Sequence, residues 1–342
     1  MLLGDGLVIA AATTWLPPGR ETVADAIAEG KVKPERAADL ALTAVPAGDV
    51  PAPELAARAA EAALTRAGVP RERVGLLVHA WIYHQGHDLW SPAHYVADRA
   101  GVGAALPVGL YQLCNGGAGA LAVAATHLLA DPGLDTALVT TGDRFAPPGF
   151  DRWTSDYSVA YGDGGTAVVL RRGPAHAGDL VLLGLAQASA PEFETMYRGR
   201  DEFSPAPRWH SDRVDARRAK KAFLAEKGID RFNAVSADRI RRVVTDALSG
   251  TGIAPTDPRI RYIALPRLAD SSLDASYVPV LDGWVPGKLI SPREHSGHLG
   301  AGDTAANLAH LHDNRLLDRG EVALVLLSGG GFSWSCAVVT VA

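Results

Sequence analysis

Short apolar runs and amphipathic stretches alternate along the whole chain. Such alternation predicts strands interleaved with helices, which is typical of layered α/β folds. The predicted strands cover residues 7–12, 74–80, 106–113, 136–141, 160–170, 180–188, 262–265, 322–328 and 335–341. The predicted helices cover residues 53–67, 92–100, 117–130, 236–249 and 302–311. We expect the last two strands to form a hairpin around three consecutive glycines.

The predicted elements follow a similar order in the two parts of the chain, although residue identity between the parts is not obvious. This order indicates an N-terminal half, residues 1–172, and a C-terminal half, residues 173–342, which arose by an old duplication. Two stretches lie outside the pattern. Residues 17–51 are polar and interrupted by Pro and Gly, with one short helical pattern. Residues 190–232 are charged and rich in aromatic side chains, and we expect them to cap a site.

Composition then limits the class of protein. The 342 residues are 47% hydrophobic and 21% charged, which is enough apolar material for a large core. A formal net charge of −5 argues against a nucleic-acid partner and against binding to an anionic membrane surface. Cys114 and Cys336 are too few for a disulfide framework. No secretion signal is visible, and apolar runs such as 322–327 are too short to cross a bilayer, so we expect a soluble, cytoplasmic protein.

The most informative single residue is Cys114, in the segment LCNGGAGA between a predicted strand and a helix of small residues. This position predicts a tight turn at the N-terminus of a buried helix. The helix dipole and the free backbone N–H groups favour negative charge there, so they favour the nucleophilic thiolate and can hold an oxyanion. The arrangement indicates transfer of an acyl group from a thioester. Most free cysteines are small core residues, and Cys336 in the last strand is expected to be one of them.

Four motifs together resemble the β-ketoacyl synthase III branch of the thiolase superfamily, over most of the chain. They are the turn at Cys114; residues 161–167 (YGDGGTA), similar to the family's FGDGAGA; residues 302–306 (GDTAA), where the family has GNTSAA; and residues 329–334 (GGGFSW), which match GGGFTWG. The resemblance implies a thiolase-like α/β fold, duplicated into five α-β-α-β-α layers. It also implies a homodimer formed through an edge strand and an oxyanion hole built from the N–H groups of Cys114 and Gly330.

Three departures from the family pattern change the expected chemistry. Arg267 stands where the family has its catalytic histidine, Asp303 stands at the position of the catalytic asparagine, and the RTGI segment that helps to hold coenzyme A is not visible near residues 34–46. A subgroup in antibiotic pathways also carries this aspartate, and it moves acyl groups onto a hydroxyl or an amine. That subgroup, which keeps the histidine, is the nearest relative that the resemblance implies.

The replacement of asparagine by Asp303 disfavours carbon–carbon condensation, because a carboxylate repels the enolate that condensation creates. Asp303 is better suited to orient a base or to accept a proton. Arg267 could pair with Asp303 or bind a substrate carboxylate, but it is a poor general base. The base is then expected among the histidines. His298 is the catalytic candidate, and His84, His87 and His295 are candidates for lining the substrate pocket, although Gly-flanked histidines also often pack turns.

We therefore expect an acyltransferase of secondary metabolism that forms an acyl-enzyme on Cys114 and passes the acyl group to a hydroxyl or amine of a small metabolite. The donor is a thioester on coenzyme A or on the phosphopantetheine of an acyl carrier protein, with no tightly bound cofactor and no metal. Decarboxylative condensation and an inactive partner subunit on the same scaffold are the alternatives. Cationic residues between 213 and 227 form a solvated face or a docking patch for an acidic carrier protein. They are Arg213, Arg217, Arg218, Lys220, Lys221 and Lys227.

Overall fold

One sheet of ten strands dominates the computed structural model, which describes residues 2–342. The strands of the first half are β1 (Leu2–Trp15), β4 (Val74–Ala80), β5 (Leu106–Leu110), β6 (Thr136–Asp143) and β7 (Gly164–Arg171). Those of the second half are β8 (Leu180–Ser189), β9 (Ile260–Ala264), β10 (Lys288–Ile290), β11 (Val322–Gly329) and β12 (Ser333–Val341). A separate two-stranded sheet pairs β2 (Arg20–Thr22) with β3 (Ala44–Pro46).

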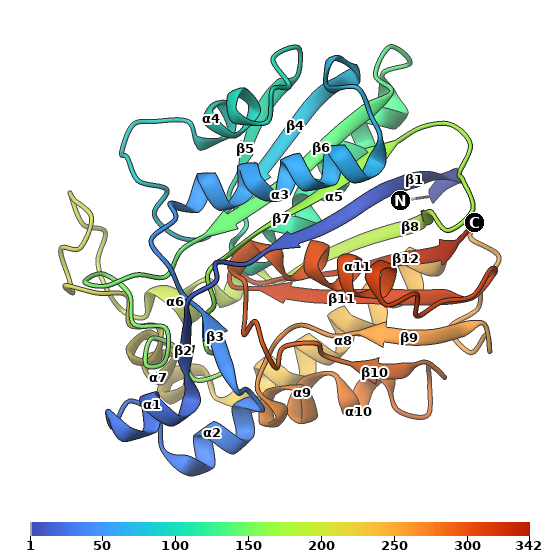
Figure 1. The fold of residues 1–342 in the computed structure, drawn as a ribbon. Coiled ribbons are helices and arrows are strands. Elements are labelled where there is room, and N and C mark those ends of the chain that lie inside the picture. The colour runs from blue at the N-terminus through green and yellow to red at the C-terminus, as the bar shows by residue number, and fades with distance from the viewer. Residues whose placement is uncertain (1) are drawn as a thin grey trace.

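The order of strands repeats between the halves. It runs β5-β4-β6-β7-β1 in the first half and β10-β9-β11-β12-β8 in the second. In each half the first three strands pair in parallel and the next two pair antiparallel. Antiparallel pairing of β1 with β8 joins the halves in the middle of the sheet, as Figure 1 shows. The α/β class and its duplicated strand order are therefore confirmed, while the boundary at residue 172, in the turn between β7 and β8, stays a prediction.

Helices cover and separate the two parts of the sheet. Those that pack on strands of the main sheet are α3 (Ala52–Ala67), α4 (Pro92–Arg99), α5 (Gly116–Ala130), α8 (Ile229–Leu248) and α11 (Asp303–Asp313). Helix α3 packs on β1, β6 and β7, and α8 packs on β8 and β12. Helices α5 and α11 touch each other, and their side chains share one core cluster with strands of both halves. The layers therefore run helix, sheet, paired central helices, sheet, helix.

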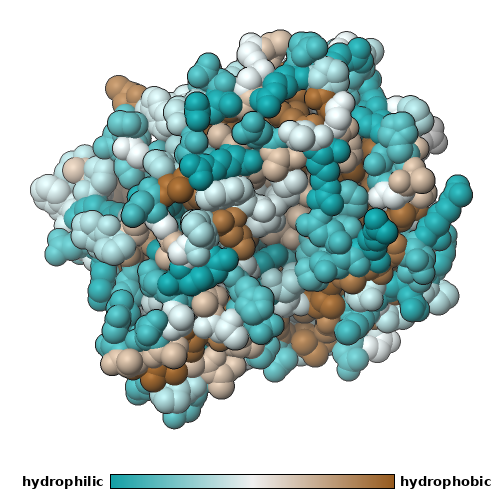
Figure 2. Space-filling model, viewed as in Figure 1, coloured by the Kyte–Doolittle hydropathy of each residue, from teal (hydrophilic) through white to brown (hydrophobic). Residues whose placement is uncertain are grey.

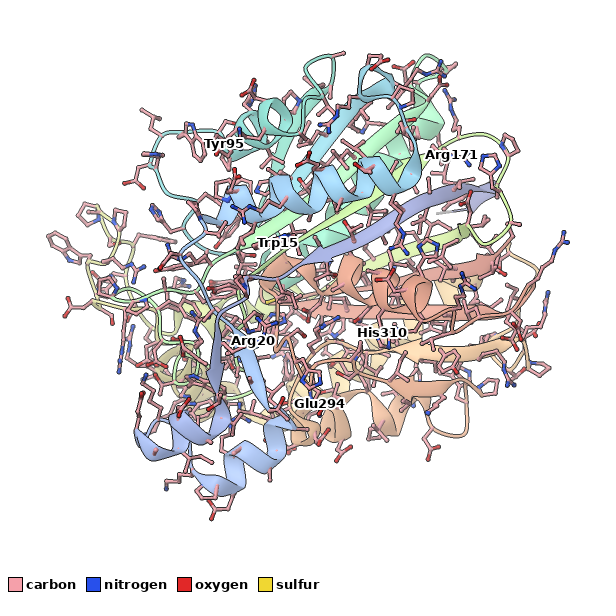
Figure 3. All side chains as sticks on the ribbon, viewed as in Figure 1. Trp15, Arg20, Tyr95, Arg171, Glu294 and His310 are labelled. Atoms are coloured by element: carbon pink, nitrogen blue, oxygen red, sulfur yellow. The ribbon has the colours of Figure 1, made fainter. Side chains whose placement is uncertain are left out.

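Further helices build the periphery. They are α1 (Val23–Ala28), α2 (Pro34–Leu40), α6 (Thr195–Arg198), α7 (Ala216–Lys227), α9 (Asp270–Ser276) and α10 (Val278–Leu281). Helices α1 and α2 with strands β2 and β3 make up the polar segment 17–51, which extends from the main sheet in Figure 1. Trp15, labelled in Figure 3, ends β1 beside α3, and the Arg58 guanidinium of α3 lies 4.7 Å from its ring centroid.

Four predicted elements have other bounds in the structure. The strand predicted over residues 7–12 is longer and runs from Leu2 to Trp15 as β1, and the other three differ for local reasons. The strand that leads to Cys114 ends at Leu110 because residues 113–115 form a 3₁₀ turn. The strand predicted from residue 160 begins at Gly164, because the residues before it form a loop. Helix α8 begins at Ile229 rather than at 236, directly after Gly228, whose φ of 72° separates it from α7.

The surface and the core agree with the composition. Hydrophilic residues cover most of the face drawn in Figure 2, and apolar residues form only small patches on it. Among the described residues one segment, Leu113–Ala130, is long and apolar enough to cross a membrane. More than half of that segment is buried inside the protein, where α5 forms part of the central layer.

Candidate active site

The turn that carries Cys114 joins β5 to α5, and residues from both halves of the chain hold it by hydrogen bonds. Leu113 has a φ of 47°, which a side chain of its size adopts only when its surroundings impose it. The buried Asn115 amide donates to Gln112 Oε1 at 3.1 Å, and its Oδ1 accepts from the Ser335 hydroxyl of β12 at 2.8 Å. Strand β12 of the second half thus fixes the turn of the first half. The half-buried Cys114 stands where α5 begins.

His298 is the side chain that meets the sulfur. Its Nε2 lies 3.0 Å from Cys114 Sγ, and its Nδ1 lies 2.7 Å from Asp303 Oδ2. Two backbone hydrogen bonds position the histidine, since its N–H donates to Ala160 at 2.8 Å and its carbonyl accepts from Gly162 at 3.0 Å. The Tyr161 ring packs 5.3 Å from the imidazole. The result is a chain of three functional groups, thiol, imidazole and carboxylate, from both halves of the protein.

The carboxylate of Asp303 is fully buried at the start of α11. It accepts from the Leu299 N–H at 2.9 Å and from the Arg267 N–H at 3.2 Å, and the Arg267 Nε lies 3.7 Å away. Burial by itself raises the pKa of Asp303, but His298 and Arg267 outweigh it and hold the pKa below its ordinary value. Burial likewise opposes the charge of His298, yet Asp303 and Cys114 raise the pKa of this histidine well above its ordinary value. The pair therefore favours an imidazolium beside a carboxylate.

Arg267 lies behind Asp303 and does not face the thiol. This placement corrects the expectation that Arg267 is a catalytic residue. Its guanidinium donates to the Pro292 carbonyl at 2.7 Å, to the Ser296 hydroxyl and to Asn307 Oδ1 at 3.2 Å. Of its two expected roles, the ion pair with Asp303 is the one the geometry provides. The side chain is buried and does not line the pocket, so the expectation that Arg267 binds a substrate carboxylate is wrong.

The expectation that His84, His87 and His295 line the substrate pocket is also wrong. All three are exposed and none contributes to the pocket wall. The loop after β4 turns outward because the buried Asp143 carboxylate accepts the N–H groups of both Ile82 and Tyr83 at 2.9 Å. His295 bonds to the Thr43 hydroxyl at 3.0 Å on the surface.

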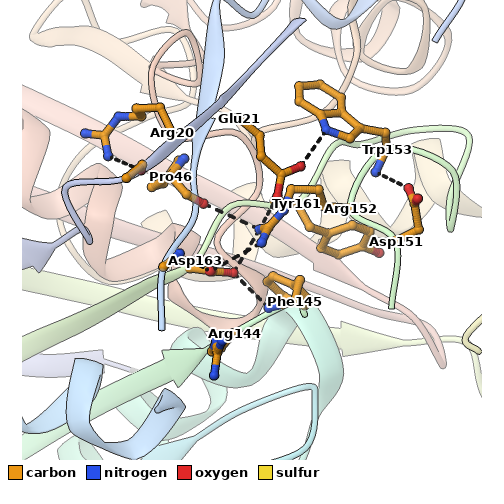
Figure 4. Close-up of polar contacts among 12 residues, drawn as sticks. Arg20, Glu21, Pro46, Arg144, Phe145, Asp151, Arg152, Trp153, Tyr161 and Asp163 are labelled. Carbon is orange, nitrogen blue, oxygen red and sulfur yellow. Dashed lines mark hydrogen bonds and ion pairs between the residues drawn. The ribbon is translucent and has the colours of Figure 1, made fainter. Parts of the chain in front are cut away.

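The turn that precedes β7 supports His298 through a buried ion pair. Asp163 Oδ1 accepts from Arg152 Nη1 at 2.9 Å and from the Phe145 N–H at 2.8 Å, and Figure 4 shows this network. Arg152 also donates to Glu21 Oε1 at 2.8 Å, which brings in the polar segment near the N-terminus. Asp163 is thus a turn-forming aspartate in its Gly-rich segment. Sequence reasoning missed Arg152, since nothing in its local context reveals a partner across a loop.

A cavity of about 260 Å³ opens beside the thiol and the imidazole. Aromatic and aliphatic side chains make up most of its wall, and Gly329 and Gly330 of the glycine hairpin form part of it. The residues that were expected to cap a site contribute side chains from α6, α7 and the start of α8. They are Met196, Tyr197, Lys220, Leu224, Ile229 and Phe232.

The cationic residues of α7 do not form the uniform charged face that was expected. Lys220 is buried against Asp156, and Arg217 donates to the carbonyls of Asp156 and Trp153, both at 2.9 Å. Arg218 is paired with Asp201. Lys227 is paired with Glu226, so four of the six cationic residues have partners within the chain. Arg213, Arg218, Lys221 and Lys227 stay exposed, and docking of an acidic carrier protein on them remains a prediction.

Comparison with known proteins places this site in a family. A family model described as 3-oxoacyl-[acyl-carrier-protein (ACP)] synthase III matches residues 110–186. A β-ketoacyl-[acyl-carrier-protein] synthase III of Rhodospirillum centenum is 28% identical over 292 residues, covering 84% of this chain and 83% of the relative. A solved structure named ChlB3, described as an acyltransferase, is 32% identical with a TM-score of 0.87, and 98% of each chain is covered.

A second solved structure, 3-oxoacyl-(acyl carrier protein) synthase III of Pseudomonas aeruginosa, shares the fold at 23% identity. Its TM-score is 0.76, and 98% of each chain is covered. The first structure matches nearly the whole chain at 32% identity, and the second shares its fold. Both findings agree with the four sequence motifs that resemble the family. The chain therefore belongs to the β-ketoacyl-acyl-carrier-protein synthase III-like branch of the thiolase superfamily.

Proposed function

We propose that this enzyme is an acyltransferase of secondary metabolism, which takes an acyl group from a thioester onto Cys114 and passes it to a hydroxyl or amine of a small metabolite. The observation that carries the proposal is the contact chain from Cys114 Sγ through His298 to the buried carboxylate of Asp303. A nucleophile, a base and a group that orients the base are the parts that acyl transfer requires. The acyltransferase ChlB3, similar over 98% of the chain, supports the same reading.

In the first step His298 Nε2 accepts the Cys114 proton, and the thiolate attacks the carbonyl carbon of the donor thioester. The N–H groups of Cys114 and Gly330 receive the oxyanion of the tetrahedral intermediate. Collapse breaks the bond to the donor sulfur, which leaves with the proton from His298. The products of this step are acyl-Cys114 and the free thiol of the donor.

In the second step the same nitrogen of His298 accepts a proton from the hydroxyl or amine of the acceptor, whose oxygen or nitrogen attacks the acyl carbon. The intermediate expels Cys114 as a thiolate, which recovers the proton from His298. Asp303 keeps Nδ1 protonated through both steps and stabilises each imidazolium. Arg267 acts as a positioning residue, because it holds Asp303 and does not touch the reacting atoms.

Decarboxylative condensation is the second candidate, and the 28% identity to a β-ketoacyl synthase III favours it. Condensation creates an enolate beside the acyl-cysteine, where neutral donors are needed to stabilise it. Here the second residue beside the imidazole is a buried carboxylate with a lowered pKa, which can only accept hydrogen bonds. This charge disfavours an enolate and favours a reaction that releases a proton from the acceptor.

The partners follow the same proposal. An acyl carrier protein is the expected donor, since the relatives named above are synthases that act with one, and coenzyme A remains the alternative. A homodimer is expected through β5, which lies at the end of the sheet and exposes Leu106, with Tyr111 exposed directly after it. Light scattering that gives the mass of a monomer would contradict the dimer.

Incubation with acyl thioesters, followed by mass spectrometry of the intact protein, tests the proposal. The wild type is expected to gain the mass of the acyl group, and the Cys114→Ala variant none. Cys336→Ala serves as the matched control and is expected to be acylated like the wild type, because Cys336 is fully buried in β12. Addition of amines or alcohols should then remove the adduct. Carbon dioxide released from a malonyl thioester would favour condensation instead.

A further inference from the structure

The apolar wall of the pocket contains a buried ion pair that the proposed mechanism does not use. Lys220 Nζ of α7 lies 2.6 Å from Asp156 Oδ1 and 2.8 Å from Oδ2. Lys220 is 9% exposed and Asp156 1% exposed, and both contribute to the wall of the cavity that holds Cys114 and His298. A buried pair of charges costs desolvation and is weak support for stability, so its presence in a substrate pocket calls for a chemical reason.

The pair presents a donor and an acceptor side by side with no net charge. The ammonium of Lys220 has three N–H donors, and its nitrogen lies 4.8 Å from the Tyr197 ring centroid. Asp156 Oδ1 also accepts from the Ser158 N–H at 2.9 Å. A carboxylate has about four sites for accepting hydrogen bonds, so capacity remains beside the lysine. A substrate group that both accepts and donates a hydrogen bond can therefore bind the Lys220 ammonium and the Asp156 carboxylate at the same time.

A second wall of the same cavity offers an independent polar contact. The Tyr277 side chain is 1% exposed and contributes to the pocket wall, and its hydroxyl has no partner with hydrogen-bond geometry among residues 2–342. Ser328 is its polar neighbour. Leaving a buried hydroxyl unpaired costs free energy, which a ligand with a polar atom in this pocket would recover.

The size of the cavity limits what can occupy it. An engineered apolar cavity of roughly 150 Å³ holds one benzene molecule, and the cavity beside Cys114 has about 260 Å³. It therefore has room for one substituted ring or for an acyl chain of similar volume, and the side chains of the wall decide between them. The aromatic wall, which includes Tyr161, Phe232 and Trp334, suits a flat ring.

We propose that Lys220 and Asp156 determine specificity, by selecting a ring-sized substrate that carries a neutral hydroxyl group. The hydroxyl oxygen accepts from the Lys220 ammonium, and its hydrogen is donated to Asp156. This inference rests on the proposed function of the same pocket. A substrate carboxylate in this place would be repelled by Asp156, a substrate ammonium would be repelled by Lys220, and a ring without a hydroxyl gains neither hydrogen bond.

The hydroxyl can belong to the acyl group or to the acceptor, and the two half-reactions separate these sources. Benzoyl and the three monohydroxybenzoyl thioesters of N-acetylcysteamine probe the first half-reaction through the rate of adduct formation on Cys114. Cyclohexylamine and the aminocyclohexanols, added to one preformed acyl-enzyme, probe the second. In one of the two half-reactions, one hydroxylated probe is expected to react about 10- to 100-fold faster than its parent, as for a hydrogen bond to a charged group.

The decisive variant removes both members of the pair. Lys220→Met alone leaves a buried carboxylate unpaired and is expected to destabilise the fold, whereas Lys220→Met with Asp156→Leu replaces the pair by apolar side chains of similar length. In the folded double variant the ratio of the rate with the hydroxylated probe to the rate with the parent ring should fall to about one, whatever the absolute rates are. Lys221→Met, on the exposed side of the same helix, is the control and should keep the preference.

Three results would overturn the inference. The first is a wild-type protein that reacts equally with all probes of both sets. The second is an unchanged preference in the folded double variant. The third is an equal loss of rate with every thioester in that variant, which would assign the pair to the fold or to the pantetheine arm. Absence of any adduct on wild-type Cys114 would contradict the proposed function itself, so the two failures are distinguishable.

Discussion

At the scale of single residues, the buried charges around Cys114 sum to zero whether the shared proton lies on Cys114 Sγ or on His298 Nε2. With the proton on sulfur, the charges of Asp303 and Arg267 cancel. With the proton on His298, a thiolate and an imidazolium are added, and the sum is again zero. Moving the proton across the 3.0 Å between Sγ and Nε2 therefore creates a thiolate–imidazolium pair without adding net charge, and Asp303, 2.7 Å from Nδ1, stabilises the imidazolium.

Asp303→Asn tests this balance. The amide cannot stabilise an imidazolium and can turn its NH₂ towards Nδ1, so the wrong nitrogen of His298 would carry the proton. We expect kcat/KM for acyl transfer to fall about 10³- to 10⁴-fold, as in other catalytic triads. We also expect the pKa of His298 to fall, because the carboxylate that raises it is gone. Rapid-quench kinetics and an NMR titration of the histidine ring measure the two effects.

The matched control for this variant is Asp313→Asn. Asp313 closes the same helix α11, but it is exposed and pairs with Arg66 on the surface. Its substitution should leave both the rate and the titration of His298 unchanged. A folded Asp303→Asn protein with less than a tenfold loss would contradict the role of the carboxylate.

At the scale of elements, the glycine hairpin between β11 and β12 lies against the Cys114 turn. A Cβ on Gly330 would come within 2.6 Å of Tyr197 Cε2 and 2.9 Å of Leu113 Cδ1, so Gly330→Ala must displace either the hairpin or the turn. We expect a loss of kcat of at least about 100-fold, the cost of one oxyanion donor, with little change in Tm. Gly103→Ala is the control, since its Cβ would meet no atom within 4 Å. Equal kinetics of the two variants would exclude Gly330 from the oxyanion hole.

His79 makes the packing of β4 against β6 sensitive to pH. It is fully buried, its Nδ1 lies 3.1 Å from the Thr140 hydroxyl, and burial lowers its pKa from 6.5 to about 4. Between these values the unfolded chain binds a proton that the folded protein does not. The free energy of unfolding should therefore fall as pH drops from about 6.5 to about 4, by about 3 kcal/mol in total from this residue.

Urea unfolding of the wild type and of His79→Asn, compared at pH 7.5, 6 and 5, measures this contribution. Asparagine cannot take up the proton, so the wild type should lose more stability than the variant as pH falls. Parallel pH dependences of the two proteins would contradict the assignment. The comparison isolates His79 because both proteins share every other titrating group.

At the scale of the whole molecule, the central layer makes the two halves depend on each other. Helix α5 has no Asp, Glu, Lys or Arg between Gly116 and Ala130, and it packs in one cluster with α11 of the second half. Residues 1–172 expressed alone would expose this apolar helix and the edge of β1 that pairs with β8. We expect the fragment to lack a cooperative thermal transition.

Co-expression with residues 173–342 is the control for that fragment. If the halves reassemble, the complex should recover a cooperative transition and acylation of Cys114, because His298 and Asp303 come from the second half. A sharp transition of the isolated fragment, seen by calorimetry, would show instead that each half folds independently.

Local sequence determined much of this protein. The alternation of apolar and amphipathic segments predicted nine strands of the main sheet and the five helices that pack on it, and the glycines after Cys114 predicted a turn at a helix start. These patterns depend only on neighbours along the chain. The resemblance to the family motifs, rather than local patterning, singled out Asp303, and His298 followed as a histidine close before it in the chain.

Only the tertiary structure decided which residues meet. His298 lies 184 positions after Cys114, and Arg267 and Asn307 approach Asp303 from separate segments. The motif position alone pointed to Arg267, yet packing turned it behind the carboxylate and brought His298 to the sulfur. His84, His87 and His295 have local contexts as suggestive as that of His298, but their loops fold outward. Contacts of this kind are fixed by the packing of whole layers, which no short stretch of sequence encodes.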